Sequence, residues 1–534
     1  MVRTDLLAAE AGEQSHALKA VVAALVGNNE SIGSAFRTLD AAGFRVTICG
    51  NRISVNDALY VQYTGRSTGD DGSGAGSWLF YGSDDSTART TPTGDLMTTR
   101  SNIESTVMEQ VRVGNALRKF SIAVVGMGYV GVPTALSFTD QGAHVVGYDV
   151  SESRLTAIKD TRIDLLPRDR PRLVRAVEDE LLRLTTEPSA IADTDLVVVC
   201  VPTPIDHHLT PDLSALARAC DTVVKYARRG QVIVLTSTTY AGCTADLLVQ
   251  PLQRRGFEVG TDIYVAFSPE RIDPGVVDHA PEKTPRVIGG HTRTCSERAA
   301  AFLTHTAGAL HTVSSPKAAE MTKLIENTFR AVNIALANEF ADAASDLEVD
   351  IMEVISAAST KPYGYMPFFP GPGVGGHCIP CDPHYLLWQL KAKRTTSPVV
   401  DAAMNAISAR PRDVVAKAQR VLGENGKPCR GARILVVGVS YKPGLGDVRE
   451  SPAMAIIDLL AEAGAELFYC DPYVEAVHTS AGETLFHYAE PERQQWDLVV
   501  VHTVHPDTDN SWLADQPTVL DATYRLRFPG MHTL

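Results

Sequence analysis

The chain has 534 residues, more than one hydrophobic core supports, so we expect about three or four domains. Hydrophobic residues make up 44% and charged residues 21%, as in globular proteins, and no apolar run approaches the ~20 residues that cross a bilayer. The net charge of −14 disfavours nucleic acid as a partner. Acidic residues near the N-terminus interrupt any secretory signal, so we expect a cytoplasmic protein without membrane insertion.

The first 64 residues predict a small α+β extension. Helical periodicity covers 16–26 and 31–42, and strand-like runs follow at 45–49 and 58–63. No motif in it indicates a function. Binding of a partner protein is one hypothesis for its role.

Residues 65–118 are predicted to form a linker that is largely disordered. Up to about residue 100 the segment is rich in Gly, Ser, Thr and Asp, which bury too little apolar surface to order a chain. A helix over 102–117 leads into the next part.

From Ser121 onward short apolar runs alternate with helical stretches, a rhythm typical of a parallel sheet with crossover helices. A long amphipathic helix over 317–346 suggests a domain junction or a subunit contact, so we expect at least a homodimer. A second strand-and-helix series begins at Ala432. The predicted fold is α/β, with two Rossmann-like doubly wound domains joined by a central helical domain. The predicted boundaries are 119–315 for the cofactor domain, 316–412 for the central domain and 413–534 for the last domain.

The strand at 122–125 runs into the glycine pattern GMGYVG, and a helix pattern follows. In a dinucleotide fold the first glycine permits the turn, the second lets the pyrophosphate approach, and the third lets the helix pack closely. Asp149 ends the next strand, where its carboxylate would bind ribose hydroxyls and repel a 2′-phosphate. We therefore expect NAD rather than NADP, although Arg154 nearby weakens that preference.

Residues 368–385 read FFPGPGVGGHCIPCDPHY, the most distinctive stretch of the chain. Its glycines and prolines predict a loop that lets backbone approach a ligand closely. Cys378 lies on this loop, with Asp382 four residues later. Cys378 and Cys381 have the C-x-x-C spacing of metal sites, but no second such pair completes a zinc site, so we expect no metal. The nine cysteines are odd in number and scattered, which indicates reduced thiols.

The ordered motifs GMGYVG, YDVSESR, CVPTP, LTSTT, SPERIDPG, RVIGG, AAEMTKLIENTFRAVNIALANEF, GPGVGGHCIPCDP and VGVSYKPGLGDVRESP together carry a resemblance. Over residues 121–521 the chain resembles the UDP-glucose / UDP-N-acetylmannosamine 6-dehydrogenase family. The resemblance implies NAD-dependent oxidation of the C6 alcohol of a UDP-linked hexose to a carboxylate, as in polysaccharide biosynthesis. Such a four-electron oxidation needs two hydride transfers.

The resemblance also implies site residues. Cys378 would capture the aldehyde as a thiohemiacetal whose oxidation gives a thioester. Glu270 matches the family's general base, and Lys323 and Asn327, four residues apart on one helix face, match its oxyanion-stabilising lysine and a polar neighbour. The remaining catalytic matches are Asp382, for proton transfer or water positioning, and Thr238, near the reacting centre.

The other matches divide between the cofactor and the nucleotide sugar. The predicted cofactor contacts are Gly126, Gly128, Tyr129, Val130, Gly131, Asp149, Arg154, Thr203, Thr238 and Arg449. The predicted substrate contacts are Glu270, Arg271, Lys323, Asn327, Phe368, Phe369, Gly371, Gly373, Gly375 and Lys442.

The chain departs from the family pattern at two places. Residues 237–244 read STTYAGCT and lack a proline and a threonine that the family often has, which leaves the shape of this loop open. Cys381 stands where the family usually has an aliphatic residue or a lysine. We expect it to pack, and a regulatory disulfide with Cys378 is the alternative.

The version of the loop with His377 before Cys378 resembles the branch that acts on UDP-N-acetylhexosamines. We expect UDP-N-acetylglucosamine first, UDP-N-acetylmannosamine next and UDP-glucose behind them. Two other classes stay open: a one-step dehydrogenase of the hydroxyacid type, which would need neither Cys378 nor the last domain, and a nucleotide-sugar sensor or scaffold.

Overall fold

The computed structural model describes two parts of the chain, which form separate units, 1–116 and 117–534. In the first unit it describes the backbone of four strands. In the second unit it describes all residues except 118, 164, 166–167, 272–283 and 377.

The four described strands of the first unit form one antiparallel sheet in the order β1-β2-β3-β4. Their bounds are Val46–Cys49, Arg52–Val55, Leu59–Thr64 and Ser77–Gly82. β1 and β3 correspond to the two predicted strands, whereas the predicted helices at 16–26, 31–42 and 102–117 lie outside the described residues or at their margin.

One described strand, β4, lies within the segment that was predicted to be a largely disordered linker. This strand, SWLFYG, pairs with β3 along its whole length, from Leu59 opposite Gly82 to Thr64 opposite Ser77. Its aromatic and aliphatic residues have a high strand propensity. The Gly- and Ser-rich sequence around β4 dominates the average composition of this segment, so composition alone does not predict so short a strand.

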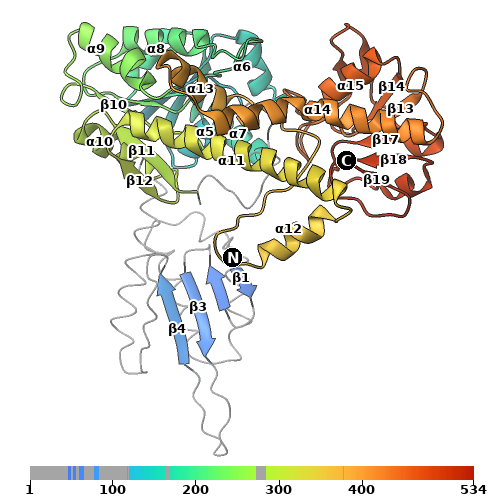
Figure 1. The fold of residues 1–534 in the computed structure, drawn as a ribbon. Helices are drawn as coiled ribbons and strands as arrows, with labels where there is room; N and C mark the ends of the chain where they lie inside the picture. The colour runs from blue at the N-terminus through green and yellow to red at the C-terminus, as the bar shows by residue number, and fades with distance from the viewer. Residues whose placement is uncertain are drawn as a thin grey trace, which may run out of the picture. The chain divides into compact units, whose positions relative to one another are not determined.

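The second unit begins with an eight-stranded sheet in the order β12-β11-β10-β9-β8-β5-β6-β7 (Figure 1). The strands are β5 Ser121–Val125, β6 His144–Tyr148, β7 Leu182–Thr185, β8 Leu196–Val199, β9 Val232–Leu235, β10 Tyr264–Phe267, β11 Arg286–Gly290 and β12 Leu310–Val313. The six from β5 to β10 are parallel, and β11 runs antiparallel to β10. The predicted parallel sheet is confirmed. The strand order reverses between β5 and β8, which is where doubly wound sheets bind ligands.

This sheet is buried on both faces because helices cover both of them. Ile122 and Val124 of β5 join one apolar cluster, while Ala123 and Val125 join the cluster on the opposite face. All four side chains are buried, which explains why the strand reads as a continuous apolar run. The main covering helices are α5 Gly131–Thr139, α6 Glu152–Lys159, α7 Asp169–Glu178, α8 Ser214–Tyr226 and α10 Arg293–Leu303.

A helical region follows, and a five-stranded parallel sheet ends the chain (Figure 1). The helices are α11 Pro316–Asp346, α12 Ile351–Ser359, α13 Asp382–Ala392 and α14 Pro398–Glu424. The sheet has the order β14-β13-β17-β18-β19, formed by β13 Arg433–Val437, β14 Glu466–Cys470, β17 Leu498–Val501, β18 Val519–Asp521 and β19 His532–Thr533, with α15 Pro452–Glu462 connecting β13 to β14. Among the described residues, no helix is both long and apolar enough to cross a bilayer.

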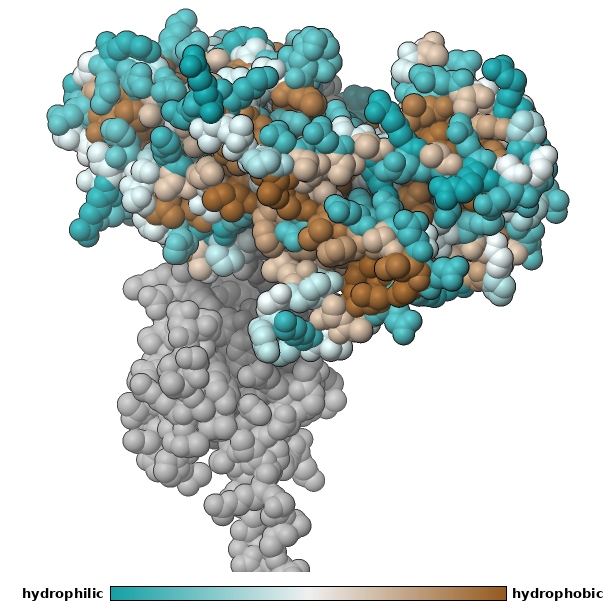
Figure 2. Space-filling model, in the orientation of Figure 1, coloured by the Kyte–Doolittle hydropathy of each residue, from teal (hydrophilic) through white to brown (hydrophobic). Residues whose placement is uncertain are grey.

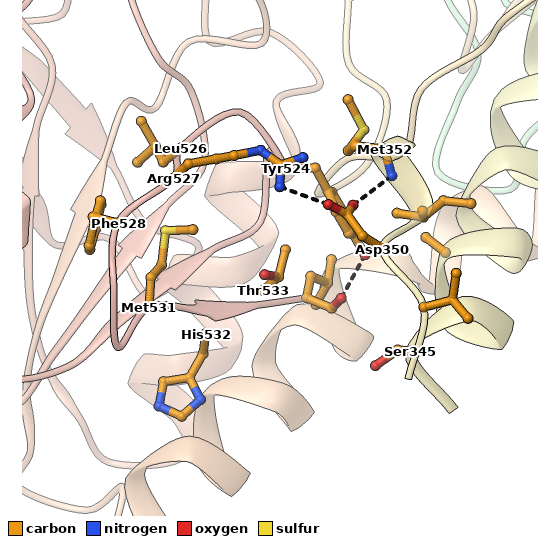
Figure 3. A pocket seen from close by; sticks show the side chains of 14 residues that line it. Ser345, Asp350, Met352, Tyr524, Leu526, Arg527, Phe528, Met531, His532 and Thr533 are labelled. Carbon is orange, nitrogen blue, oxygen red and sulfur yellow. Dashed lines mark hydrogen bonds and ion pairs between the residues drawn. The ribbon is translucent and has the colours of Figure 1, made fainter. Parts of the chain in front are cut away.

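A cavity of about 730 Å³ lies where α11 and α12 meet the C-terminal segment (Figure 3). Arg527 donates to the Asp350 carboxylate at 2.7 Å across it, and that carboxylate also accepts from the Met352 backbone N–H at 2.9 Å. Tyr524 donates to the Leu534 carbonyl at 2.7 Å. None of the residues predicted for catalysis lines this cavity.

Candidate active site

The glycine turn after β5 has a different environment at each of its three glycines. Gly126 has a φ of +92°, and a Cβ there would lie 2.6 Å from the Cys200 carbonyl oxygen. A Cβ on Gly131, the first residue of α5, would lie 1.8 Å from the Gly126 oxygen, so helix and turn pack in direct contact. A Cβ on Gly128 would meet nothing within 4 Å. The turn is therefore closed at its first and third glycines and open at the second, where a pyrophosphate could approach.

Two residues predicted to contact the cofactor hold this turn from the neighbouring strand and helix. Asp149 accepts the Met127 backbone N–H at 2.8 Å with one carboxylate oxygen and the Ser151 N–H at 2.9 Å with the other. Arg154 donates from Nε to the Met127 carbonyl at 3.1 Å. The turn is thus shaped before any ligand binds.

The loops that follow β8 and β9 are joined to the helix that follows Cys378. The Thr203 hydroxyl donates to the Thr238 carbonyl at 2.8 Å, and the Tyr385 hydroxyl donates to the Thr203 carbonyl at 3.1 Å. Tyr385 lies on α13, and its burial raises the pKa of its hydroxyl above the usual range. Our sequence reasoning missed Tyr385, although it lies one helical turn after Asp382.

The loop at 237–244, whose shape the sequence left open, is held by two helices of the central region. Glu320 of α11 is buried and accepts from the Gly242 N–H at 2.5 Å, the Thr244 N–H at 2.8 Å and the Thr244 hydroxyl at 2.6 Å. The side-chain amide of Gln389 in α13 accepts a hydrogen bond from the Ala241 N–H and donates one to the Ala241 carbonyl. Glu320 was also missed, although it lies one turn before Lys323.

Asp382, Asn327 and Lys323 form one polar group, in which Asp382 and Asn327 are buried and Lys323 is half-buried. Asp382 is 3% exposed and accepts a hydrogen bond from the Asn327 side-chain amide. Burial raises the pKa of Asp382 to about 6, while the charge of Lys323 and the hydrogen bond from Asn327 act to lower it. Lys323 donates from Nζ to the Glu270 carbonyl at 2.9 Å. The raised pKa brings the ionisation of the Asp382 carboxyl closer to neutral pH than that of an exposed aspartate.

Cys378 lies one turn before this group, since its carbonyl accepts the Asp382 backbone N–H at 2.9 Å. Its side chain is exposed, whereas Cys381 is buried at 3% exposure and burial raises the pKa of the Cys381 thiol to about 12. Of the C-x-x-C pair, Cys378 is thus the thiol that a substrate can reach. This is consistent with the packing role expected for Cys381.

Glu270 is engaged in an ion pair with Arg286, a buried residue that sequence reasoning did not single out. One Glu270 carboxylate oxygen also accepts the Arg271 backbone N–H at 2.9 Å. The Arg271 guanidinium pairs with Glu326 of α11. In this arrangement Glu270 would have to exchange its partner Arg286 to act as a base, and its catalytic role stays a prediction.

The predicted sugar loop is anchored at Gly371. Its N–H donates to the Asn338 side-chain oxygen at 2.9 Å, and its carbonyl accepts from Arg410 Nε at 3.1 Å. Arg410 is buried and binds both carboxylate oxygens of Asp342, at 2.7 and 2.9 Å. Phe368 packs edge-on against Phe329 of α11, whereas Phe369 is exposed. Asn338 and Arg410 were not predicted.

The last domain contacts both the glycine turn and the loop before Cys378. The Arg449 guanidinium lies 5.9 Å from the centre of the Tyr129 ring, and the Arg449 carbonyl accepts the Gly376 N–H at 3.2 Å. Gly373, at a φ of +144°, and Gly375 both lie against Pro452 at the start of α15. Predicted residues of three segments far apart in sequence are thus brought together, and His377 lies outside the described residues.

Comparison with known proteins covers the same three regions. Models of the UDP-glucose/GDP-mannose dehydrogenase family match its NAD binding domain at 120–306, its central domain at 317–406 and its UDP binding domain at 435–527. The match of the last domain disfavours the one-step hydroxyacid alternative. Residues before 120 lie outside these matches.

Relatives of known description are similar along most of the chain. A UDP-N-acetyl-D-glucosamine 6-dehydrogenase of Pseudomonas aeruginosa is 32% identical over 74% of this chain and 92% of its own length. A UDP-N-acetyl-D-mannosamine dehydrogenase of Pyrococcus horikoshii is 34% identical over 72% and 90%. The structure of a UDP-D-ManNAc dehydrogenase of Pyrococcus horikoshii covers 77% of this chain and 98% of its own, with a TM-score of 0.71 and 30% identity. The chain therefore belongs to the UDP-glucose/GDP-mannose dehydrogenase family and is an NAD-dependent oxidoreductase.

Proposed function

We propose that this protein oxidises the C6 alcohol of a UDP-N-acetylhexosamine to a carboxylate through a thioester on Cys378. The observation that carries the proposal is the exposed Cys378 thiol one turn before the polar group of Asp382, Asn327 and Lys323. UDP-N-acetylglucosamine is the preferred substrate, with UDP-N-acetylmannosamine next and UDP-glucose as the alternative. Relatives described as dehydrogenases of the two N-acetylated sugars support this substrate class.

The turn from Gly126 to Gly131 and Asp149 would hold NAD, which accepts one hydride per molecule, so each sugar would reduce two molecules of NAD. After the first oxidation the Cys378 thiolate attacks the aldehyde carbon, and a carbon–sulfur bond forms. Loss of a hydride and a proton from this adduct leaves a thioester. Water then cleaves the carbon–sulfur bond and releases the carboxylate and the thiolate.

The surrounding side chains support these steps by charge and proton transfer. The Lys323 ammonium stabilises negative charge that develops on the sugar oxygen, and a low-dielectric site strengthens this interaction. Asp382, with its pKa raised to about 6 by burial, accepts a proton at neutral pH and returns it. Asn327 fixes the orientation of that carboxylate.

Counting NADH formed per sugar consumed tests this function. Purified protein is incubated with NAD and each of the three UDP-sugars, and NADH and the sugar acid are both quantified. Two NADH per sugar, with the highest kcat/KM for UDP-N-acetylglucosamine, is the expected result. One NADH per sugar would overturn the thioester route, and no turnover of any of the three sugars would favour the sensor alternative.

We further propose that the protein is a homodimer in the cytoplasm that contributes to polysaccharide biosynthesis, and that the first unit binds a partner protein. The dimer proposal is supported by an exposed apolar stripe on α11, formed by Ile325, Phe329, Leu336 and Phe340. At 100° per residue these four lie within about 60° of the helix circumference. Figure 2 shows apolar residues gathered along this helix. Exposed apolar patches of this kind mark protein interfaces.

Replacing Phe340 with glutamate is expected to convert the dimer into a monomer, because a charge would be buried without a partner in the interface. Sedimentation velocity measures the change. Glu339→Gln, an exposed neighbour on the same helix, is the control and is expected to stay dimeric. A wild-type protein that sediments as a monomer at micromolar concentration would contradict the proposal.

A further inference from the structure

A buried carboxylate organises the loop that follows β13 in the last domain. Asp471, at the end of β14, is fully buried and accepts from the Val439 N–H at 2.8 Å, the Ser440 N–H at 3.0 Å and the Ser440 hydroxyl at 2.7 Å. Burial alone would raise the pKa of Asp471, but hydrogen bonds from His505 and Ser440 lower it to about 2. The carboxylate is therefore charged whenever the protein is folded near neutral pH.

His505 connects this carboxylate to the far end of the same loop. Its Nε2 lies 3.1 Å from an Asp471 oxygen, and its Nδ1 accepts the Gly444 backbone N–H at 3.0 Å. Because a backbone N–H can only donate, Nδ1 carries no proton, and the ring proton is on Nε2, directed at Asp471. The side chain is 2% exposed and stacks on Tyr473 with 4.6 Å between ring centres. His505 thus fixes the loop between Val439 and Gly444.

This loop forms one wall of the glycine segment that precedes Cys378. A Cβ on Gly375 would lie 2.6 Å from the Tyr441 Cβ, and one on Gly376 would lie 2.9 Å from the Tyr441 ring. Gly376, at a φ of +78°, also donates to the Arg449 carbonyl. A displacement of the loop would therefore move both the backbone two residues before Cys378 and Lys442, the predicted substrate contact.

We propose that His505 is a positioning residue for the reaction: its Nδ1 holds the 439–449 loop in the conformation that receives the nucleotide and supports the glycines before Cys378. The inference rests on the proposed function, because it assigns the loop its role through the nucleotide sugar and the Cys378 thiol. It assigns His505 an effect that acts through the loop.

Two substitutions separate the two ring nitrogens. His505→Asn places an amide oxygen near the position of Nδ1 and keeps an acceptor for Gly444, whereas His505→Gln places an amide nitrogen near Nε2 and leaves the Gly444 N–H without its acceptor. Losing that buried hydrogen bond is expected to raise the KM for the UDP-sugar about tenfold in His505→Gln. Once the UDP-sugar is bound, it stabilises the native conformation of the 439–449 loop in the variant as well. The kcat is therefore expected to change less than about twofold, and the KM for NAD is expected to stay unchanged. His505→Asn is expected to stay within about threefold of wild type.

Equilibrium binding of UDP alone, with thermal melting to confirm folding, completes the test. His505→Gln is expected to bind UDP about tenfold more weakly, in line with its KM. Equal effects of the two substitutions, or a fall in kcat with KM unchanged, would overturn the inference, because a general loss of folded protein behaves in that way. UDP binding does not depend on the sulfur chemistry, so failure of the thioester route at Cys378 would be recognised separately.

Discussion

The Cys378→Ser variant is expected to form no measurable sugar acid, with kcat reduced by about 10⁴-fold or more. A serine hydroxyl is scarcely ionised near neutral pH, whereas a thiolate is a strong nucleophile there. Binding of UDP and of NAD is expected to stay near wild type, because the exposed Cys378 side chain contributes little to either site. Steady-state NADH formation and quantification of the acid measure the effect.

Cys381→Ala is the matched control, because it removes the second thiol of the same C-x-x-C pair. That side chain is buried, so its loss is expected to lower stability by about 1 kcal/mol and to leave kcat within about twofold. Similar losses of activity in both variants would mean that the loop as a whole, and not the Cys378 sulfur, is what the reaction requires. Sustained acid production by Cys378→Ser would remove the thioester route altogether.

The second large effect is expected at Asp382, whose replacement by asparagine should lower kcat about 10²- to 10³-fold. The amide keeps an oxygen that can accept from Asn327 but cannot take up a proton. Since burial raises the pKa of Asp382 to about 6, wild-type kcat/KM is expected to rise with pH through that value as the carboxylate forms. In Asp382→Asn this rise of kcat/KM with pH, the acidic limb of the profile, is expected to disappear. An unchanged limb in the variant would show that another group titrates there.

Thermal stability is the control for the Asp382→Asn variant. The direction in which stability changes with pH follows from the raised pKa of Asp382. A pKa raised above the unfolded value of 3.8 means that the folded protein binds the proton more tightly. The carboxyl group therefore costs stability as pH rises from about 4 to about 6, and that cost persists at neutral pH. Asp382→Asn is expected to melt no lower than wild type at pH 7, as measured by thermal unfolding. A lost activity with an unchanged melting temperature then reports on chemistry rather than on folding.

Local patterns were enough to predict many of the strands, the glycine turn and the long helix. Each depends on residues that are close in sequence: the apolar run 122–125 before Gly126, and the helical periodicity from 317 to 346. The steric roles predicted for Gly126 and Gly131 agree with what a Cβ at each position would meet. The same local reasoning failed at β4, where a six-residue strand stands within a Gly- and Ser-rich segment.

The family and the NAD-dependent chemistry were accessible from sequence because ordered motifs record which side chains are present. Tertiary structure decided the state of those side chains. Burial gives Asp382 its pKa near neutrality, Arg286 engages Glu270, and Glu320 holds a loop 76 residues away. Tyr385 reaches Thr203 across 182 residues, and His505 reaches Gly444 across 61. Desolvation and hydrogen bonding depend on which surfaces meet in space, and no local pattern in the chain encodes those contacts.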